Sequence, residues 1–262
     1  MEIKLLLSTP FGQTPRHVRI PSPPSKEITM WGTKLARRCR NTIAILSIGM
    51  LTLHASAASD LPSISKAALE QQLQVGDLLF IRVPALPFRK VASTTNSWTN
   101  HVGIIVSIDG PEPVIAESTF PVSKRGGLER FLARSEGGRV EVSRLNTPLT
   151  AEQQRVLIQA TQARMGVFYD TGFDLHSRRQ FCSRFVHEVL REASGIEVGE
   201  AETFATLLAR NPEADQDFWK YWYFGQIPWD RQTVTPASVM NSAQVHAVFD
   251  GFVTTGKPPA RI

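Results

Sequence analysis

Cys182 is the residue of this 262-residue chain whose type and position best suit covalent chemistry. It stands where a polar loop turns into an amphipathic helix, in the stretch Phe181-Cys182-Ser183. A helix start carries unpaired N–H groups and the positive end of the helix dipole, and both favour a thiolate over a thiol. A cysteine in this position is therefore a candidate nucleophile. Taken alone, a cysteine before a helix is more often an inert core thiol.

Two upstream residues could supply the base and the orienting group that a thiol nucleophile needs. His101 begins an apolar strand, and Glu117 lies near the end of the next predicted strand. If the two strands pair as a hairpin, their polar ends meet at one edge of the sheet. A shift of one residue would instead turn Glu117 away and bring Ser118 or Ala116 inward. Each residue alone has a plainer interpretation, as a surface or capping histidine and a solvated carboxylate.

His176 and His187 are the other histidines near this stretch. His187 is five residues past Cys182 on the same helix and points to a different face, and His176 lies in the preceding loop. Neither has metal-ligand partners at suitable spacing, so we expect both to be structural or surface residues. No metal site, no cofactor and no phosphate-binding glycine loop is predicted, and the sequence carries no nucleic-acid signature.

The basic composition belongs to the N-terminal part of the chain. The whole sequence has 29 Lys and Arg against 24 Asp and Glu. Residues 1–57 hold 8 basic and 2 acidic residues, which leaves 21 basic and 22 acidic residues in 58–262. This net charge of −1 gives no reason to expect a nucleic acid or an anionic surface as a partner.

Residues 30–57 have the features of a secretory signal peptide. A basic cluster at 34–40 precedes an apolar run of 12 residues at 42–53, and a small-residue cleavage site follows at 55–57. The apolar run is short for a membrane span, although an uncleaved anchor is the alternative. We predict that translation starts at Met30, so that residues 1–29 are not made, and that the mature protein is periplasmic or secreted without a stable transmembrane segment.

Cleavage of this leader would also change the cysteine content. It would remove Cys39 and leave Cys182 without a partner for an intramolecular disulfide. In an exported protein such a lone thiol is either free and reactive or used between chains.

Residues 58–262 are expected to form one α+β domain, in which an antiparallel sheet packs against helices. Apolar or alternating runs predict about four strands, at 78–83, 101–108, 113–118 and 138–145. Thr150 and Gln153 form a capping-box pattern at the start of a helix predicted over 150–165. A second helix is predicted over 183–193.

The C-terminal part of the chain has weaker secondary-structure patterns. An extension rich in aromatic residues is predicted from about residue 202, with its densest segment at 218–229. The last dozen residues are expected to be a tail.

Three segments resemble the circularly permuted papain-like superfamily, and most closely its YiiX and YebB-like branch. This branch is related to NlpC-type peptidases and to the lecithin retinol acyltransferase group. The segments are residues 76–80, residues 100–105, and Tyr169-Asp170 followed by residues 181–186, so the resemblance covers roughly residues 74–200. Ordinary papain-like enzymes place the cysteine before the histidine. Permuted members place the histidine strand first and the cysteine helix last, which is the order in this chain.

The resemblance implies roles for individual residues. It implies that Cys182 is the nucleophile, that His101 is the base and that Glu117 is the third polar residue. Tyr169 matches a tyrosine often found ahead of the cysteine, which would line the substrate pocket or donate to an oxyanion; a core aromatic is the alternative. Family members often have an acidic residue two positions after the cysteine, whereas this chain has Arg184, which changes the charge beside the nucleophile. The segment 218–229 has no clear counterpart in the family.

These features predict an exported cysteine hydrolase that cleaves an amide or ester bond through a Cys-His-Glu triad and a thioester acyl-enzyme, with acyl transfer as a variant. The resemblance implies a cell-wall peptide or a lipid-like acyl compound as the substrate. The competing hypothesis is a non-catalytic envelope module that keeps the fold in order to bind peptidoglycan or acyl chains.

Overall fold

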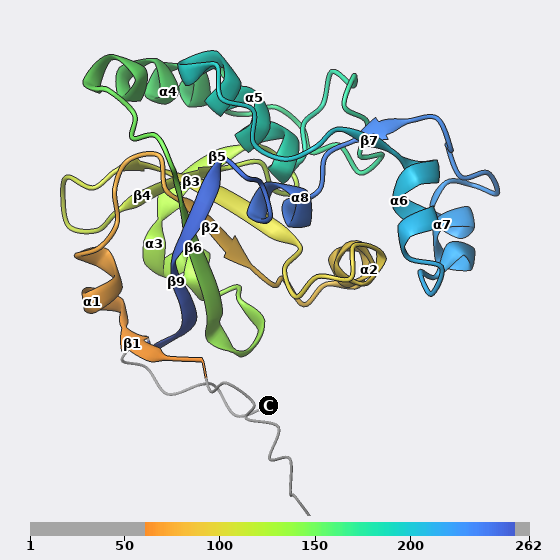
Figure 1. The fold of residues 1–262 in the computed structure, drawn as a ribbon, viewed down its shortest axis with the longest axis horizontal. Helices are drawn as coiled ribbons and strands as arrows, with labels where there is room; N and C mark the ends of the chain where they lie inside the picture. The colour runs from red at the N-terminus through yellow and green to blue at the C-terminus, as the bar shows by residue number, and fades with distance from the viewer. Residues whose placement is uncertain (1–60, 255–262) are drawn as a thin grey trace, which may run out of the picture. The chain divides into compact units, whose positions relative to one another are not determined.

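The computed structural model describes residues 61–254, and its main element is a sheet of seven strands in the order β1-β9-β6-β2-β3-β4-β5 (Figure 1). The predicted leader, residues 1–57, and the predicted start at Met30 lie outside the described residues. The strands are β1 (Ser63–Ser65), β2 (Leu78–Ile81), β3 (His101–Ser107), β4 (Val114–Glu117), β5 (Lys124–Gly127), β6 (Arg139–Leu145) and β9 (Val245–Thr254).

The helices are short apart from two. The described helices are α1 (Lys66–Glu70), α2 (Leu86–Thr94), α3 (Leu128–Leu132), α4 (Ala151–Ala163), α5 (Cys182–Ser194), α6 (Phe204–Arg210), α7 (Gln216–Trp222) and α8 (Pro236–Met240), with a 3-10 turn at Glu136–Gly138. The helices predicted over 150–165 and 183–193 are confirmed as α4 and α5. Within residues 61–254, no helix combines the length and the apolar character needed to cross a membrane.

The predicted fold class is confirmed, because an antiparallel sheet packs against helices. The four predicted strands correspond to β2, β3, β4 and β6, but the prediction of about four strands was too low. The pairing of β1 with β9 is parallel, and every other neighbouring pair in this sheet is antiparallel. A separate two-stranded ribbon joins β7 (Glu202–Thr203) and β8 (Gln232–Thr233).

β9 is the largest difference from the sequence prediction. It pairs along the whole of β6, from Phe252 opposite Arg139 to Val245 opposite Leu145, so residues 251–254 are a strand and not a tail. The strand contains His246 and Asp250, and few of its side chains are fully buried. Its apolar alternation is therefore too weak to identify it as a strand from the sequence.

Both faces of the central strands are buried. In β2, Leu78 and Phe80 belong to the core beneath α4 and α5, whereas Leu79 and Ile81 belong to the core on the α1 and α3 side. Successive side chains of a strand point to opposite faces, so a strand covered on both sides has a continuous apolar sequence. The central strands are therefore fixed from two sides, which gives a rigid edge for the polar residues at their ends.

α5 packs against α4 and β3 and is the best-buried helix of the structure (Figure 1). It ends at Gly195, whose φ of 72° lies in the left-handed region where glycine has no Cβ penalty. The capping box predicted at Thr150 and Gln153 is present at the start of α4. The buried residues of α5 include Phe185, Val186, Val189 and Leu190.

We predict that Gly251→Ala destabilises the protein by about 1–3 kcal/mol, because a Cβ there would lie 2.1 Å from the backbone oxygen of Pro62. Gly126→Ala is the matched control in a strand, since a Cβ there meets nothing within 4 Å, and it should stay within about 0.5 kcal/mol of wild type. Urea unfolding measures both changes. Equal midpoints for the two variants would contradict the close approach of β9 to Pro62.

Candidate active site

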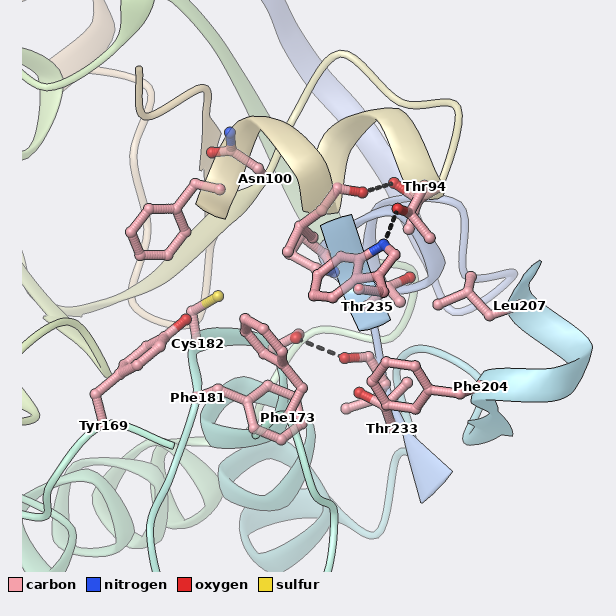
Figure 2. Close-up of a pocket in the computed structure, with 17 residues that line it drawn as sticks. Thr94, Asn100, Tyr169, Phe173, Phe181, Cys182, Phe204, Leu207, Thr233 and Thr235 are labelled. Carbon is pink, nitrogen blue, oxygen red and sulfur yellow. Dashed lines mark hydrogen bonds between the residues drawn. The ribbon is translucent and has the colours of Figure 1, made fainter. Parts of the chain in front are cut away.

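Cys182 is the first residue of α5, and Phe181 before it is the N-cap. The helix has 13 residues, so its dipole and the unpaired N–H groups of its first turn are directed at the cysteine. The side chain is only 3% exposed and lines the cavity shown in Figure 2. The structure thus places Cys182 at a helix start, as the sequence predicted.

His101 and Glu117 lie on neighbouring strands and contact each other. His101 is the first residue of β3 and Glu117 is the last residue of β4, and these strands are antiparallel. His101 Nε2 is 2.6 Å from Glu117 Oε2, and both side chains are buried. Ser118, which a one-residue shift would have brought inward, instead donates to the backbone oxygen of Gln180. The sequence-predicted pair is therefore brought together by the sheet.

The remaining ring nitrogen of His101 is free. Nδ1 is buried and has no hydrogen-bond partner among the described residues. A carboxylate only accepts hydrogen bonds, so Glu117 keeps the proton on Nε2 and leaves Nδ1 as the acceptor of the neutral imidazole. The rings of Phe131 and Phe88 lie 5.8 and 6.3 Å from the imidazole centroid and restrict its rotation. Nδ1 is therefore the ring nitrogen left to accept a proton.

Cys182 and His101 shift each other's pKa. Burial lowers the pKa of His101, but the Cys182 thiolate and the Glu117 carboxylate outweigh burial and raise the pKa to about 9. Burial raises the pKa of Cys182, but the His101 cation, the backbone N–H of Val102 and the Tyr169 hydroxyl together bring it below that of an ordinary thiol. The pair is thus shifted toward thiolate and imidazolium.

Arg134 completes the polar chain, and the sequence analysis missed it. Its Nη2 lies 2.7 Å from both carboxylate oxygens of Glu117, and its guanidinium lies over the Phe131 ring at 5.0 Å. Burial raises the pKa of Glu117, but His101 and then Arg134 outweigh it and lower the pKa to about 2. Arg134 follows α3 in the chain, and nothing in its spacing relates it to Glu117.

Tyr169 lies next to Cys182 and is 5% exposed (Figure 2). Its hydroxyl is buried and has no hydrogen-bond partner among the described residues. Burial and the Cys182 charge raise the Tyr169 pKa well above its usual value, so the hydroxyl stays protonated and can donate. Tyr169 lines the cavity, as the sequence resemblance implied.

The cavity beside Cys182 is apolar and has a volume of about 440 Å³, including space open to solvent (Figure 2). No charged side chain of residues 61–254 lines it. Part of its wall comes from the C-terminal extension that the sequence analysis could not place. The lining residues from that extension include Phe204, Leu207, Trp219, Val234 and Pro236.

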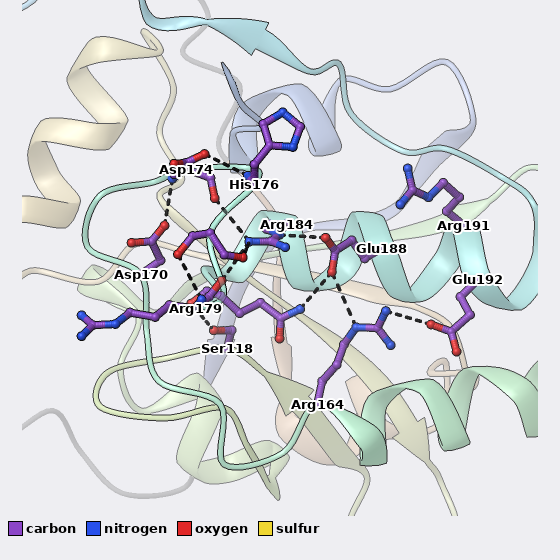
Figure 3. A network of polar contacts seen from close by, with 12 residues as sticks. Ser118, Arg164, Asp170, Asp174, His176, Arg179, Arg184, Glu188, Arg191 and Glu192 are labelled. Atoms are coloured by element: carbon purple, nitrogen blue, oxygen red, sulfur yellow. Dashed lines mark hydrogen bonds and ion pairs between the residues drawn. The ribbon is translucent and has the colours of Figure 1, made fainter. Parts of the chain in front are cut away.

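Arg184 does not leave an uncompensated charge beside Cys182. Its Nε is 2.7 Å from Glu188 Oε1, one turn further along α5, and its Nη1 donates to the backbone oxygens of Asp174, Ser177 and Arg179 (Figure 3). The arginine therefore fixes the loop before Cys182 onto α5.

His176 and His187 lie outside the Cys182 site, as predicted. His187 is buried and donates through Nδ1 to the backbone oxygen of Val198 at 2.8 Å. His176 is exposed and pairs with the side chain of Gln232. Within residues 61–254 no group of three or more His, Cys, Asp or Glu side chains is arranged to hold a metal ion.

The fold is that of a permuted papain-like protein. The family described as "Permuted papain-like amidase enzyme, YaeF/YiiX, C92 family" matches residues 72–249, and this chain belongs to that family. The chain is 29% identical over 185 residues to the uncharacterized protein YiiX of Escherichia coli K12, covering 71% of this chain and 90% of that protein. These matches confirm the predicted superfamily and its YiiX branch. The predicted extent of the resemblance, about residues 74–200, was too short, because the matched region includes the segment 218–229.

A solved structure is also similar to this chain in fold and sequence. The crystal structure of "metalloprotein yiiX" from Escherichia coli O157:H7 aligns with a TM-score of 0.64 at 29% identity, covering 69% of this chain and 99% of that chain. Its title calls that protein a metalloprotein. The donor set found in the described part of this chain does not fit a metal site, because Glu117 is already bound to both His101 and Arg134.

We predict that iodoacetamide alkylates Cys182 with a half-maximal rate at a pH below the value of about 8.5 for a free thiol, because the pKa of Cys182 is lowered. His101→Ala removes the cation and leaves burial, so its midpoint should move above that value. Mass spectrometry of the peptide that contains Cys182 measures the rate without interference from Cys39. His246→Ala changes an exposed histidine and serves as the control. Identical midpoints for wild type and His101→Ala would rule out the coupling.

Proposed function

We propose that this protein is an exported cysteine hydrolase that cleaves an amide or ester bond next to an apolar acyl group. Membership of a permuted papain-like amidase family supports a hydrolase of the amidase type. The observation that carries the finer proposal is the buried hydrogen bond between His101 and Glu117, with Nδ1 of the same imidazole left free for the cysteine. We assign Cys182 as nucleophile, His101 as base and Glu117 as the orienting residue.

Acylation begins with the Cys182 thiolate, formed by proton transfer to His101 Nδ1. Its sulfur attacks the carbonyl carbon of the substrate and gives a tetrahedral oxyanion. The carbon–nitrogen or carbon–oxygen bond then breaks, and the leaving amine or alcohol takes the proton from His101. The product that remains on the protein is a thioester of Cys182.

We assign two groups to the stabilisation of the oxyanion. The backbone N–H groups of the first turn of α5 have no partners within the helix, and the Cys182 N–H is among them. The Tyr169 hydroxyl is a second donor, because it is protonated and buried without a partner among the described residues. A donor held in a buried site stabilises developing charge without reorganisation, and the loss of one such donor costs about 10²–10³ in rate in other hydrolases.

Deacylation uses the same residues in the reverse sense. His101 removes a proton from water, and the hydroxide attacks the thioester carbon. The carbon–sulfur bond breaks to release the carboxylic acid and regenerate the thiolate beside the protonated imidazole. An acceptor alcohol or amine in place of water would make the reaction an acyl transfer.

The lining of the cavity favours an aliphatic acyl group over a cell-wall peptide. Phe88, Phe173 and Phe181 line the cavity together with Cys182, and its polar lining residues are mainly threonines. Cell-wall peptides carry carboxylates, which lose hydration energy in an apolar cavity without a cationic partner. Each buried methylene of an acyl chain instead contributes about 0.8 kcal/mol.

Export is the part of the proposal supported by the sequence alone. Residues 30–57 have a basic cluster, a short apolar run and a small-residue cleavage site in the order of a secretory signal. The protein would then act in the periplasm or outside the cell.

Steady-state hydrolysis of octanoyl p-nitroanilide, acetyl p-nitroanilide and a muropeptide tests the proposal. We expect the octanoyl compound to have the highest kcat/KM. Cys182→Ala should lose about 10³-fold or more, and His101→Ala about 10²–10⁴-fold. The exposed-histidine variant His246→Ala should keep wild-type rates. Turnover of the muropeptide alone would contradict the acyl preference, and tight binding without turnover of any compound would support a non-catalytic binding module.

A further inference from the structure

Phe173 occupies the middle of the cavity beside Cys182. Figure 2 shows it between the end formed by Cys182 and Tyr169 and the end formed by Phe204 and Leu207. Its ring makes edge contacts with three aromatic rings, at centroid distances of 6.4 Å to Tyr169, 5.8 Å to Phe181 and 6.2 Å to Trp219. The ring is therefore fixed across the path of a chain that extends from the nucleophile.

The backbone of Phe173 has an unfavourable conformation. Its φ is 51°, in the left-handed region that bulky residues rarely adopt. Such a conformation persists only where the surroundings hold it. The carboxylate of Asp170 holds one side of the turn, because Oδ1 accepts the N–H of Gly172 at 3.0 Å and Oδ2 accepts the N–H of Asp174 at 2.9 Å.

The C-terminal extension holds the other side of the turn. Trp222 Nε1 donates to the backbone oxygen of Thr171 at 2.8 Å. The Tyr223 hydroxyl and Arg231 Nη1 both donate to the backbone oxygen of Gly172, at 3.1 and 2.9 Å. We call Trp222, Tyr223 and Arg231 the clamp. Three donors from one segment thus bind the two carbonyl groups that precede Phe173.

We infer that Phe173, held by the clamp, is the residue that sets the length of the acyl chain accepted beside Cys182. This inference rests on the proposed function, because it names the feature of the substrate that the cavity selects. Apolar residues line the cavity on both sides of Phe173, with Tyr169 on one side and Phe204 and Leu207 on the other. Acyl chains that end before the Phe173 ring fit into the cavity, and longer acyl chains collide with the ring.

The expected gain in binding of longer acyl chains follows from the hydrophobic effect. Each methylene that enters apolar space is worth about fourfold in binding. Phe173→Ala removes the ring and joins the two ends of the cavity, so the optimal chain should lengthen by about two to four carbons. The clamp variant Trp222→Phe keeps a ring that can stack on Phe218 but loses the hydrogen bond to Thr171, and it should broaden the length preference.

The test is a chain-length series, measured in two ways on the full chain. kcat/KM is measured with acyl p-nitroanilides from butanoyl to tetradecanoyl, and the Kd of the matching alkanoic acids is measured by calorimetry. Phe224→Ala is the matched control, because Phe224 has a similar φ of 55° but is 98% exposed. Phe173→Leu is measured in place of Phe173→Ala if the alanine variant does not fold.

The two measurements separate the two proposals. A longer optimum in both series for the Phe173 variants, with Phe224→Ala unchanged, supports the inference. An unchanged binding profile in the Phe173 variants overturns it, whatever the rates. A shifted binding profile with no hydrolysis by any variant, wild type included, keeps the role of Phe173 and overturns the proposed function.

Discussion

The site depends on the buried hydrogen bond between His101 Nε2 and Glu117 Oε2. Burial alone would remove the charge from both groups. Cys182 and Glu117 keep the pKa of His101 raised, and His101, followed by Arg134 on both carboxylate oxygens, keeps the pKa of Glu117 lowered. With Nε2 engaged, Nδ1 is the ring nitrogen left to the cysteine. The antiparallel pairing of β3 with β4 sets this bond, and the packing of α5 against β3 brings Cys182 to the same place. The geometry of the site therefore depends on strand register and helix packing together.

The sequence was sufficient to predict the parts of the molecule governed by local patterns. The β-branched run after His101, the capping box at Thr150 and the amphipathic helix after Cys182 each form the predicted element. The sequence did not reveal β9, because a half-exposed strand with His246 and Asp250 lacks clear alternation. Whether an element could be predicted from the sequence therefore depends on how fully its residues are buried.

Site residues were predictable only where they lie at the ends of helices or strands that have a clear sequence pattern. Cys182, His101 and Glu117 do so. Arg134 is an ordinary surface arginine in sequence terms and reaches Glu117 only through the tertiary fold. The same holds for Phe173 and Trp219, whose contact joins the loop before Cys182 to the aromatic extension. Long-range contacts of this kind have no spacing that a single sequence displays, although they form the cavity wall.

Intact-protein mass spectrometry after rapid mixing with an activated octanoyl ester and acid quenching tests the proposed acyl-enzyme most directly. We expect a mass increase of one octanoyl group, located on Cys182 by peptide mapping and removed by hydroxylamine, as expected of a thioester. The adduct should be absent in Cys182→Ala. Steady release of octanoate with no adduct on Cys182, or an adduct on another residue that the Cys182→Ala variant retains, would contradict it.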